Sequence, residues 1–102
     1  DGVLLSINEF QHSSASDLNE ILNYPDPFIS STNIHFNLKR SGNVKVEIYN
    51  SFGQWIITIV DQKLENGEHL YEWNASNYSS GIYYLKISTK DQVDIKKMLL
   101  LE

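Results

Sequence analysis

Apolar and polar residues alternate along most of the chain from residue 33 onward, and this period of two restricts the fold more than any other feature. Successive side chains of a β-strand point to opposite faces, so alternation predicts strands with one buried face. The segment "NIHFNL" places Ile34, Phe36 and Leu38 on one face. The segment "NVKVEIYN" predicts a buried face of Val44, Val46 and Ile48 opposite an outward face of Lys45, Glu47 and Tyr49.

Further segments bring the predicted set to about seven strands. "QWIITIV" is apolar on both faces, so we expect a central strand that is covered on both sides. "EHLYEWN", "GIYYLKIST" and "QVDIKKMLL" also have strand patterns, and "GVLLSINEF" near the start has enough apolar residues for a short strand. At the strand borders stand Gly42, Gly53, Gly67 and Gly81, where a turn can require a positive φ. The sequence therefore predicts an all-β fold, an antiparallel β-sandwich.

Both prolines of the chain stand one residue apart in "NYPDPF". Each proline fixes its own φ, lacks an N–H donor and pushes the preceding residue toward extended conformations. We therefore expect Pro25, Asp26 and Pro27 to form a stiff corner that marks a boundary. Residues 1–22 are then a linker or the tail of a preceding domain, and residues 23–102 form the sandwich.

The segment just before this corner allows two interpretations. "QHSSASDLNEILN" begins with a serine-rich run that is typical of a linker. Leu18, Ile21 and Leu22 also form an apolar stripe of about one helical turn. The segment is either a linker that docks on the domain or a short helix.

Length and composition limit the classes of function. A chain of 102 residues is sufficient for one domain, and because it starts at Asp1 without a signal peptide it reads as a fragment of a larger protein. Its net charge of -5 argues against binding to nucleic acid or anionic membranes. With no cysteine it has neither a disulfide nor a thiolate nucleophile. No apolar run approaches the roughly 18 residues of a membrane span, so we expect no membrane insertion of its own.

Residues that could carry chemistry are scattered. His12, His35 and His69 lie in different segments without ligand-spaced neighbours, and the aspartates do not form a calcium loop. We expect His35 at a strand surface and His69 in partly buried packing. The serines stand in turns without a nucleophile-elbow pattern. We therefore predict no enzyme activity, no cofactor and no metal site.

The aromatic residues also allow two interpretations. One is a platform for sugar rings, which would make the chain a carbohydrate- or protein-binding module of a surface protein. The other, which we favour, places Trp55 and Trp73 in the sandwich core and leaves some tyrosines half-exposed on strands. The residues concerned are Trp55, Tyr71, Trp73, Tyr78, Tyr83 and Tyr84.

The segment "DIKKMLLLE" is suited to a last strand and to a terminal tag. Val93, Ile95, Lys97 and Leu99 alternate there with Met98 and Leu100. An edge strand is also a surface to which a receptor can add a strand.

Five segments of the chain are "NYPDPF", "GNVKVEIYNSFGQ", "NGEHLYEWNAS", "SSGIYYLKI" and "KKMLLLE". They occur in the same order as in the C-terminal sorting domains of the type IX secretion system of Gram-negative bacteria. The chain resembles that family from about Leu22 to Glu102. The usual residue between the prolines is Asn, whereas this chain has Asp26. The family fold implies an immunoglobulin-like sandwich, with a more distant similarity to the immunoglobulin-like domain of flagellar hook-capping proteins.

The resemblance implies a recognition module rather than an enzyme. Its partners would be the outer-membrane translocon, a sortase-like peptidase and a cargo protein joined ahead of it, and its destination, reached through the periplasm, would be the cell surface or the medium. Cleavage would fall before the prolines, with Ser13, Ser14, Ala15 and Ser16 as the candidate region. The implied sorting signal consists of Gly81, Ile82, Tyr83, Lys96, Lys97, Met98, Leu99 and Leu100.

Overall fold

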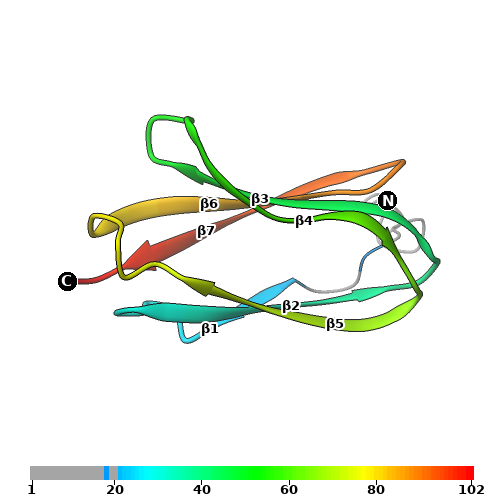
Figure 1. The fold of residues 1–102 in the computed structure, drawn as a ribbon, viewed down its shortest axis with the longest axis horizontal. Coiled ribbons are helices and arrows are strands. Elements are labelled where there is room, and N and C mark those ends of the chain that lie inside the picture. The colour runs from blue at the N-terminus through cyan, green and yellow to red at the C-terminus, as the bar shows by residue number, and fades with distance from the viewer. Residues whose placement is uncertain (1–17, 19–20) are drawn as a thin grey trace, which may run out of the picture.

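The computed structural model describes residue 18 and residues 21–102, and in this part of the chain the regular structure is β-strand without helix. Two antiparallel sheets pack face to face (Figure 1), so the predicted all-β sandwich is confirmed. The seven strands are β1 (Leu22–Tyr24), β2 (Ser31–Leu38), β3 (Gly42–Asn50), β4 (Trp55–Leu64), β5 (Gly67–Asn74), β6 (Gly81–Ser88) and β7 (Val93–Leu100).

The strand order is that of an immunoglobulin-like fold. One sheet has the order β1-β2-β5 and the other β4-β3-β6-β7. With the strands lettered A to G along the chain, these are the A-B-E and D-C-F-G sheets. The constant-type immunoglobulin arrangement differs only in pairing strand D with E. The chain therefore crosses between sheets at β2–β3, β4–β5 and β5–β6, which ties the two layers together.

The alternation in the sequence predicted the core on β2 and β3 correctly. Ile34, Phe36, Val46 and Ile48 are fully buried between the sheets. Glu47 is the exception, because we expected it outside and it is only 7% exposed. Glu47 stands on a central strand of this sheet, opposite Thr58 of β4 and Lys86 of β6, so neighbouring strands flank its side chain on both sides. Lys45 Nζ lies 3.6 Å from Glu47 Oε2, which compensates the charge of the covered carboxylate.

The prediction of a central position for β4 was wrong. This strand forms one edge of the four-stranded sheet, and Trp55 at its start is 57% exposed rather than in the core. Ile56, Ile57 and Ile59 are each only partly buried. Register shifts along β3 coil the β3–β4 hairpin away from the sandwich (Figure 1), so both faces of β4 are half-covered. Trp73, in contrast, is buried as expected.

The segment before the prolines contributes to the sandwich. Leu18 is 4% exposed and forms a bridge with Leu38, and Leu22 pairs with His35 as part of β1. The helical interpretation was therefore wrong for Leu22. A domain boundary at residue 23 stays a prediction, and the strand expected in "GVLLSINEF" lies outside the described residues.

Candidate functional site: the corner end of the sandwich

Strand pairing brings together the predicted signal residues from two separate segments. Gly81 pairs with Leu100, Ile82 with Leu99, and Tyr83 with Met98. Phe28, directly after the prolines, forms a parallel bridge with Leu100. We call this part of the molecule, which holds residues 25–28, the start of β6 and the end of β7, the corner end.

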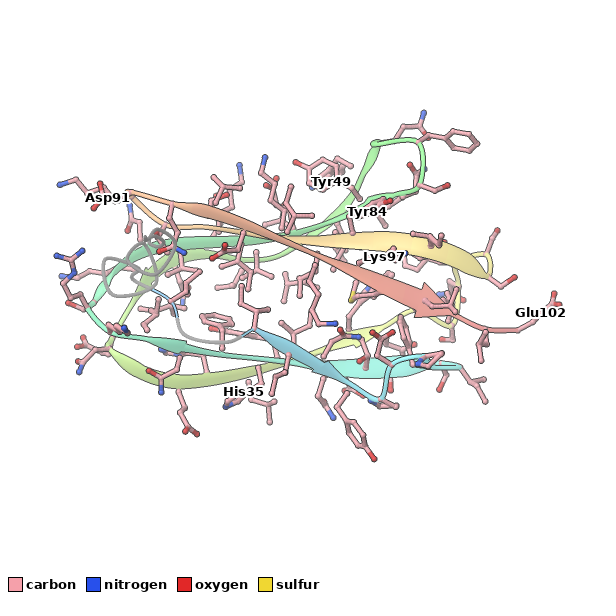
Figure 2. All side chains as sticks on the ribbon, turned by 180° about the vertical axis from the view of Figure 1, so that it is seen from behind. His35, Tyr49, Tyr84, Asp91, Lys97 and Glu102 are labelled. Carbon is pink, nitrogen blue, oxygen red and sulfur yellow. The ribbon has the colours of Figure 1, made fainter. Side chains whose placement is uncertain are left out.

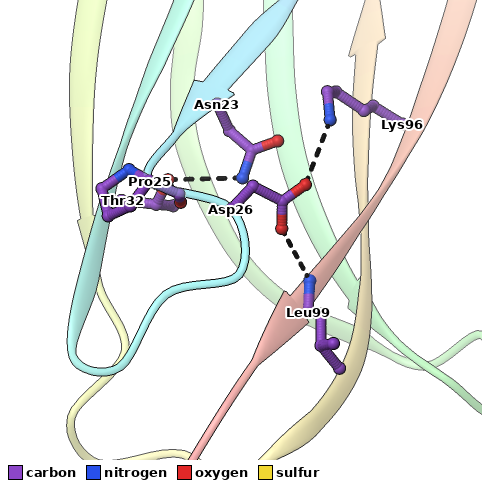
Figure 3. A network of polar contacts seen from close by, with 6 residues as sticks. All are labelled: Asn23, Pro25, Asp26, Thr32, Lys96 and Leu99. Carbon is purple, nitrogen blue, oxygen red and sulfur yellow. Dashed lines mark hydrogen bonds and ion pairs between the residues drawn. The ribbon is translucent and has the colours of Figure 1, made fainter.

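The proline corner is fastened to the last strand. The Asp26 carboxylate accepts a hydrogen bond from the backbone N–H of Leu99 at 3.1 Å and lies 3.4 Å from Lys96 Nζ (Figure 3). Phe28 N donates to the Leu99 carbonyl oxygen at 3.0 Å, and Leu101 N donates to the Phe28 carbonyl oxygen at 2.7 Å. The corner thus leaves the three-stranded sheet and covers the outer edge of β7. Besides changing the direction of the chain, the corner therefore holds the two sheets together, and we call this contact the clamp.

A second set of contacts holds the corner to its own sheet. Asn23 Nδ2 donates to Thr32 Oγ1 at 3.3 Å, and Thr32 Oγ1 donates to the Pro25 carbonyl oxygen at 2.8 Å (Figure 3). Asn23 and Thr32 are both buried. Because these bonds fix the backbone at Pro25, they also fix the position from which Asp26 reaches β7.

An aromatic cluster fills the core beneath the corner. The ring centroid of Trp73 lies 5.8 Å from Phe28, 5.6 Å from Tyr78 and 5.3 Å from Tyr83. In antibody domains a tryptophan packs on a disulfide between the sheets. This chain has no cysteine, and the aromatic cluster joins the sheets at this end instead.

Tyr83 forms the tyrosine corner that is typical of immunoglobulin-like domains. Its hydroxyl donates to the carbonyl oxygen of Ser79, four residues upstream, at 2.6 Å. Burial, with a smaller contribution from Tyr78, raises the pKa of the Tyr83 phenol. Gly81 between these residues has a φ of +144°, which side-chain-bearing residues rarely adopt. Our sequence reasoning missed this motif, although a tyrosine just after a loop at the start of the sixth strand could have indicated it.

The predicted signal residues divide into a buried set and an exposed set. Tyr83, Met98 and Leu100 are at most 6% exposed and belong to the core. Ile82 and Leu99 are 38% and 37% exposed, and Lys97, two residues before Leu99 on the same face of β7, is exposed as well. The exposed residues line a surface hollow of about 210 Å³ together with Asp26, Pro27 and Met98.

Lys97 also belongs to a row of side chains across the outer face of the four-stranded sheet. It pairs with Tyr84, which pairs with Tyr49 on β3 (Figure 2). Lys86 Nζ lies 5.5 Å from the centroid of the Tyr49 ring, within the range of a cation–π contact. This face therefore offers aromatic and cationic groups next to the hollow.

The aromatic residues do not form one continuous platform. Trp73 and Tyr83 are buried, and Tyr71 stacks on Phe36 with 6.1 Å between centroids. Trp55 lies on β4, in the other sheet from Tyr71. The exposed aromatic groups are thus distributed over different faces.

The remaining candidates for chemistry have ordinary structural surroundings. His69 is partly buried and stacks on Phe36 at 5.5 Å, as expected, and His35 Nε2 lies 3.5 Å from Glu68 Oε1 at the strand surface. The described residues contain no cluster of His, Cys, Asp and Glu that could hold a metal ion. No helix in the described part of the chain is long and apolar enough to cross a membrane. His12 and the candidate cleavage residues 13–16 lie outside the described residues.

Fold and site together define an immunoglobulin-like domain without cysteine, whose predicted signal residues meet at one end. A family model described as the secretion system C-terminal sorting domain matches residues 23–101, and the chain belongs to this family, the sorting domains of the type IX secretion system. No curated protein matches the sequence significantly. Membership implies export across the outer membrane, interaction with the type IX machinery and a cargo N-terminal to the domain.

Proposed function

We propose that this chain is a non-catalytic signal domain that directs the protein fused ahead of it across the outer membrane through the type IX secretion machinery. Family membership supports the route. The observation that carries the proposal is the meeting of residues 25–28, 81–83 and 98–100 at the corner end. A receptor that binds a folded surface needs its contact residues side by side, and these residues are adjacent in the fold although they are far apart in the sequence.

The two adjacent lysines have different roles in this proposal. Lys96 lies beside Asp26 and holds β7 against the proline corner. Lys97 points to the opposite face of the strand, where Ile82 and Leu99 are its exposed apolar neighbours. A partner surface with a carboxylate next to an apolar patch would complement this group. Lys97 is thus the lysine that the secretion machinery reads, and Lys96 is a positioning residue.

The domain acts by presenting a rigid surface rather than by chemistry. The same end of the sandwich is fixed in one conformation by the contacts of the proline corner, the hydrogen bond of Tyr83 and the aromatic cluster. Because little side-chain and loop entropy is left to lose there, binding of the exposed residues costs less free energy. No cofactor is needed for this role.

After translocation, a sortase-like peptidase removes the domain and the cargo is attached to the cell surface. The cut falls before the proline corner, in the region of Ser13, Ser14, Ala15 and Ser16. Cleavage there leaves residues 23–102 intact as a folded sandwich.

A reporter enzyme fused ahead of Asp1 tests the proposal. In a bacterium with a working type IX system, we expect reporter activity on the cell surface or in the medium. In an isogenic strain without the outer-membrane translocon, we expect the activity in the periplasm. Equal distribution in the two strains would contradict a type IX signal. The mass of the exported reporter then tests cleavage, because an intact fusion at the surface would refute removal without affecting sorting.

A further inference from the structure

The turn between β3 and β4 holds a phenyl ring in solvent. Phe52, in this turn, is 87% exposed, the highest value among the large hydrophobic residues of the described chain. The turn extends from the sandwich at the corner end (Figure 1), because β3 ends beside the start of β6. Exposure of an isolated phenyl ring contributes nothing to folding.

Asn50 holds this turn in a single conformation. Its Oδ1 accepts from Phe52 N at 2.9 Å and from Gln54 N at 3.0 Å, and its Nδ2 donates to Gln54 Oε1 at 2.8 Å. Backbone bonds add to these, from Asn50 N to the Gln54 carbonyl oxygen and from Gly53 N to the Asn50 carbonyl oxygen. The ring is therefore presented by a pre-ordered loop, which lowers the entropy lost on binding.

A surface hollow of about 380 Å³ lies beside the ring. Its lining includes Phe52 and Ile56 from the β3–β4 hairpin and Ile82, one of the exposed signal residues. Polar residues also line it: Asn50, Ser51, Asn77, Ser79 and Ser80. None of the residues that line this hollow carries a charge. A second hollow of about 480 Å³, at the opposite end of the sandwich, is lined in part by Arg40, Lys90 and Asp91 and by none of the predicted signal residues.

The absence of charge around this hollow argues against anionic ligands. Anionic lipid headgroups and acidic polysaccharides need lysine or arginine close to the binding surface, and this lining supplies neither. An uncharged protein segment suits this lining, which combines apolar side chains with the polar groups of Asn and Ser residues, and the protruding phenyl ring adds an aromatic anchor. Continuity with Ile82 links the hollow to the residues that we propose the secretion machinery reads.

We propose that Phe52 and this hollow form a second contact with a protein of the secretion machinery, which places an uncharged segment in the hollow and receives the phenyl ring in a pocket of its own. This proposal rests on the sorting function proposed above. It extends the recognition surface to the β3–β4 turn, which lies outside the signal residues predicted from the sequence.

Substitution of Phe52 in the full 102-residue chain, fused behind the reporter, tests this contact. Phe52→Ala leaves the hydrogen bonds of the turn in place, so the melting temperature stays that of the wild type. Loss of a central aromatic contact weakens binding at least about 10-fold, and we expect a comparable fall in the initial rate of export. Leu70→Ala is the matched control, because Leu70 is an exposed apolar residue on β5 of the other sheet (64%). Its export rate stays within twofold of the wild type.

The outcomes separate this proposal from the sorting function. If the wild-type fusion is exported only in the translocon-competent strain and Phe52→Ala is exported equally fast, the second contact is refuted and sorting stands. If the wild-type fusion is not exported, the sorting function itself fails. A photoreactive phenylalanine at position 52 should cross-link to a component of the secretion machinery, identified by mass spectrometry, whereas the same group at position 70 should not. Co-sedimentation of the chain with vesicles of 3:1 phosphatidylethanolamine and phosphatidylglycerol, lost in Phe52→Ala, would overturn a protein partner in favour of a lipid surface.

Discussion

Replacement of Asp26 tests whether the proline corner clamps the last strand. Asp26→Ala removes the acceptor for the Leu99 N–H and the partner of Lys96. The charge-assisted hydrogen bond contributes about 1.5–3 kcal/mol when protected from water. The hydrogen bond between Leu99 N–H and Asp26 is accessible to water, so we take the lower limit of this range, about 1.5 kcal/mol. The ion pair joins side chains that are 31% and 25% exposed, and it adds at most about 1 kcal/mol.

The expected loss is therefore about 1.5–2.5 kcal/mol in the free energy of unfolding for Asp26→Ala. For a domain of this size, it corresponds to a fall in melting temperature of roughly 6–15 °C. Asp26→Asn keeps an oxygen that can accept from Leu99 N–H but loses the ion pair and the charge assistance of the hydrogen bond, so it should cost about 0.5–1.5 kcal/mol, less than Asp26→Ala.

Urea unfolding followed by tryptophan fluorescence measures these values, since Trp73 is buried next to the corner. A double-mutant cycle with Lys96→Met isolates the ion pair and should give a coupling of at most about 1 kcal/mol. Equal destabilisation by Asp26→Asn and Asp26→Ala would refute the hydrogen bond as the main contact. A loss below about 0.5 kcal/mol for Asp26→Ala would refute the clamp as a whole, because that is the range of neutral surface substitutions.

Three further predictions concern stability at the same end. Tyr83→Phe should cost about 1 kcal/mol through loss of the bond to Ser79, measured by urea unfolding at neutral pH. Because burial raises the pKa of Tyr83 in the folded state, this tyrosine stabilises the fold fully below about pH 10, its unfolded pKa, and the stability is lost as the pH rises through the folded value. The fall above pH 10 should be smaller in Tyr83→Phe, and equal slopes would contradict this. Gly81→Ala should cost about 1–3 kcal/mol by backbone strain at a φ of +144°, although an added Cβ would meet no atom within 4 Å. Gly42→Ala, also without a neighbour within 4 Å and at an ordinary φ, should stay within about 0.5 kcal/mol, and similar melting temperatures for the two variants would rule out strain.

Local alternation was enough to predict most of the core and to divide the last strand into two faces. It separated Met98 and Leu100, which are buried, from Lys97 and Leu99, which are exposed. This separation depends only on the two-residue period of a strand, which any single segment displays. Three of the four border glycines also have the positive φ that their positions suggested: Gly53, Gly67 and Gly81.

Features that depend on pairing between distant segments could not be predicted from local alternation. The contact between Asp26 and Leu99 joins residues 73 positions apart, and no local pattern specifies it. The edge position of β4 likewise follows from the strand order, because an apolar segment fits a covered centre and a coiled edge equally well. The contact between Lys96 and Asp26, which distinguishes Lys96 from Lys97, also follows only from the position of the corner beside β7.

The central claim is that exposed residues at the corner end are the sorting signal. Deletion of residues 96–102 is not a clean test, because it removes Met98 and Leu100 from the core and would unfold the domain. Substitution of the exposed residues avoids this difficulty. We therefore choose the triple variant Ile82→Ser, Lys97→Glu and Leu99→Ser, and the control Leu70→Ser with Lys63→Glu on exposed positions elsewhere.

The decisive measurement is the fraction of a fused reporter that reaches the cell surface or medium in a type IX-competent bacterium. Both variants must first show a cooperative unfolding transition like that of the wild type. The account predicts that the triple variant accumulates in the periplasm, with exported reporter reduced at least about 10-fold, while the control is exported like the wild type. Export of a folded triple variant at the wild-type level would contradict the claim that this surface is the signal.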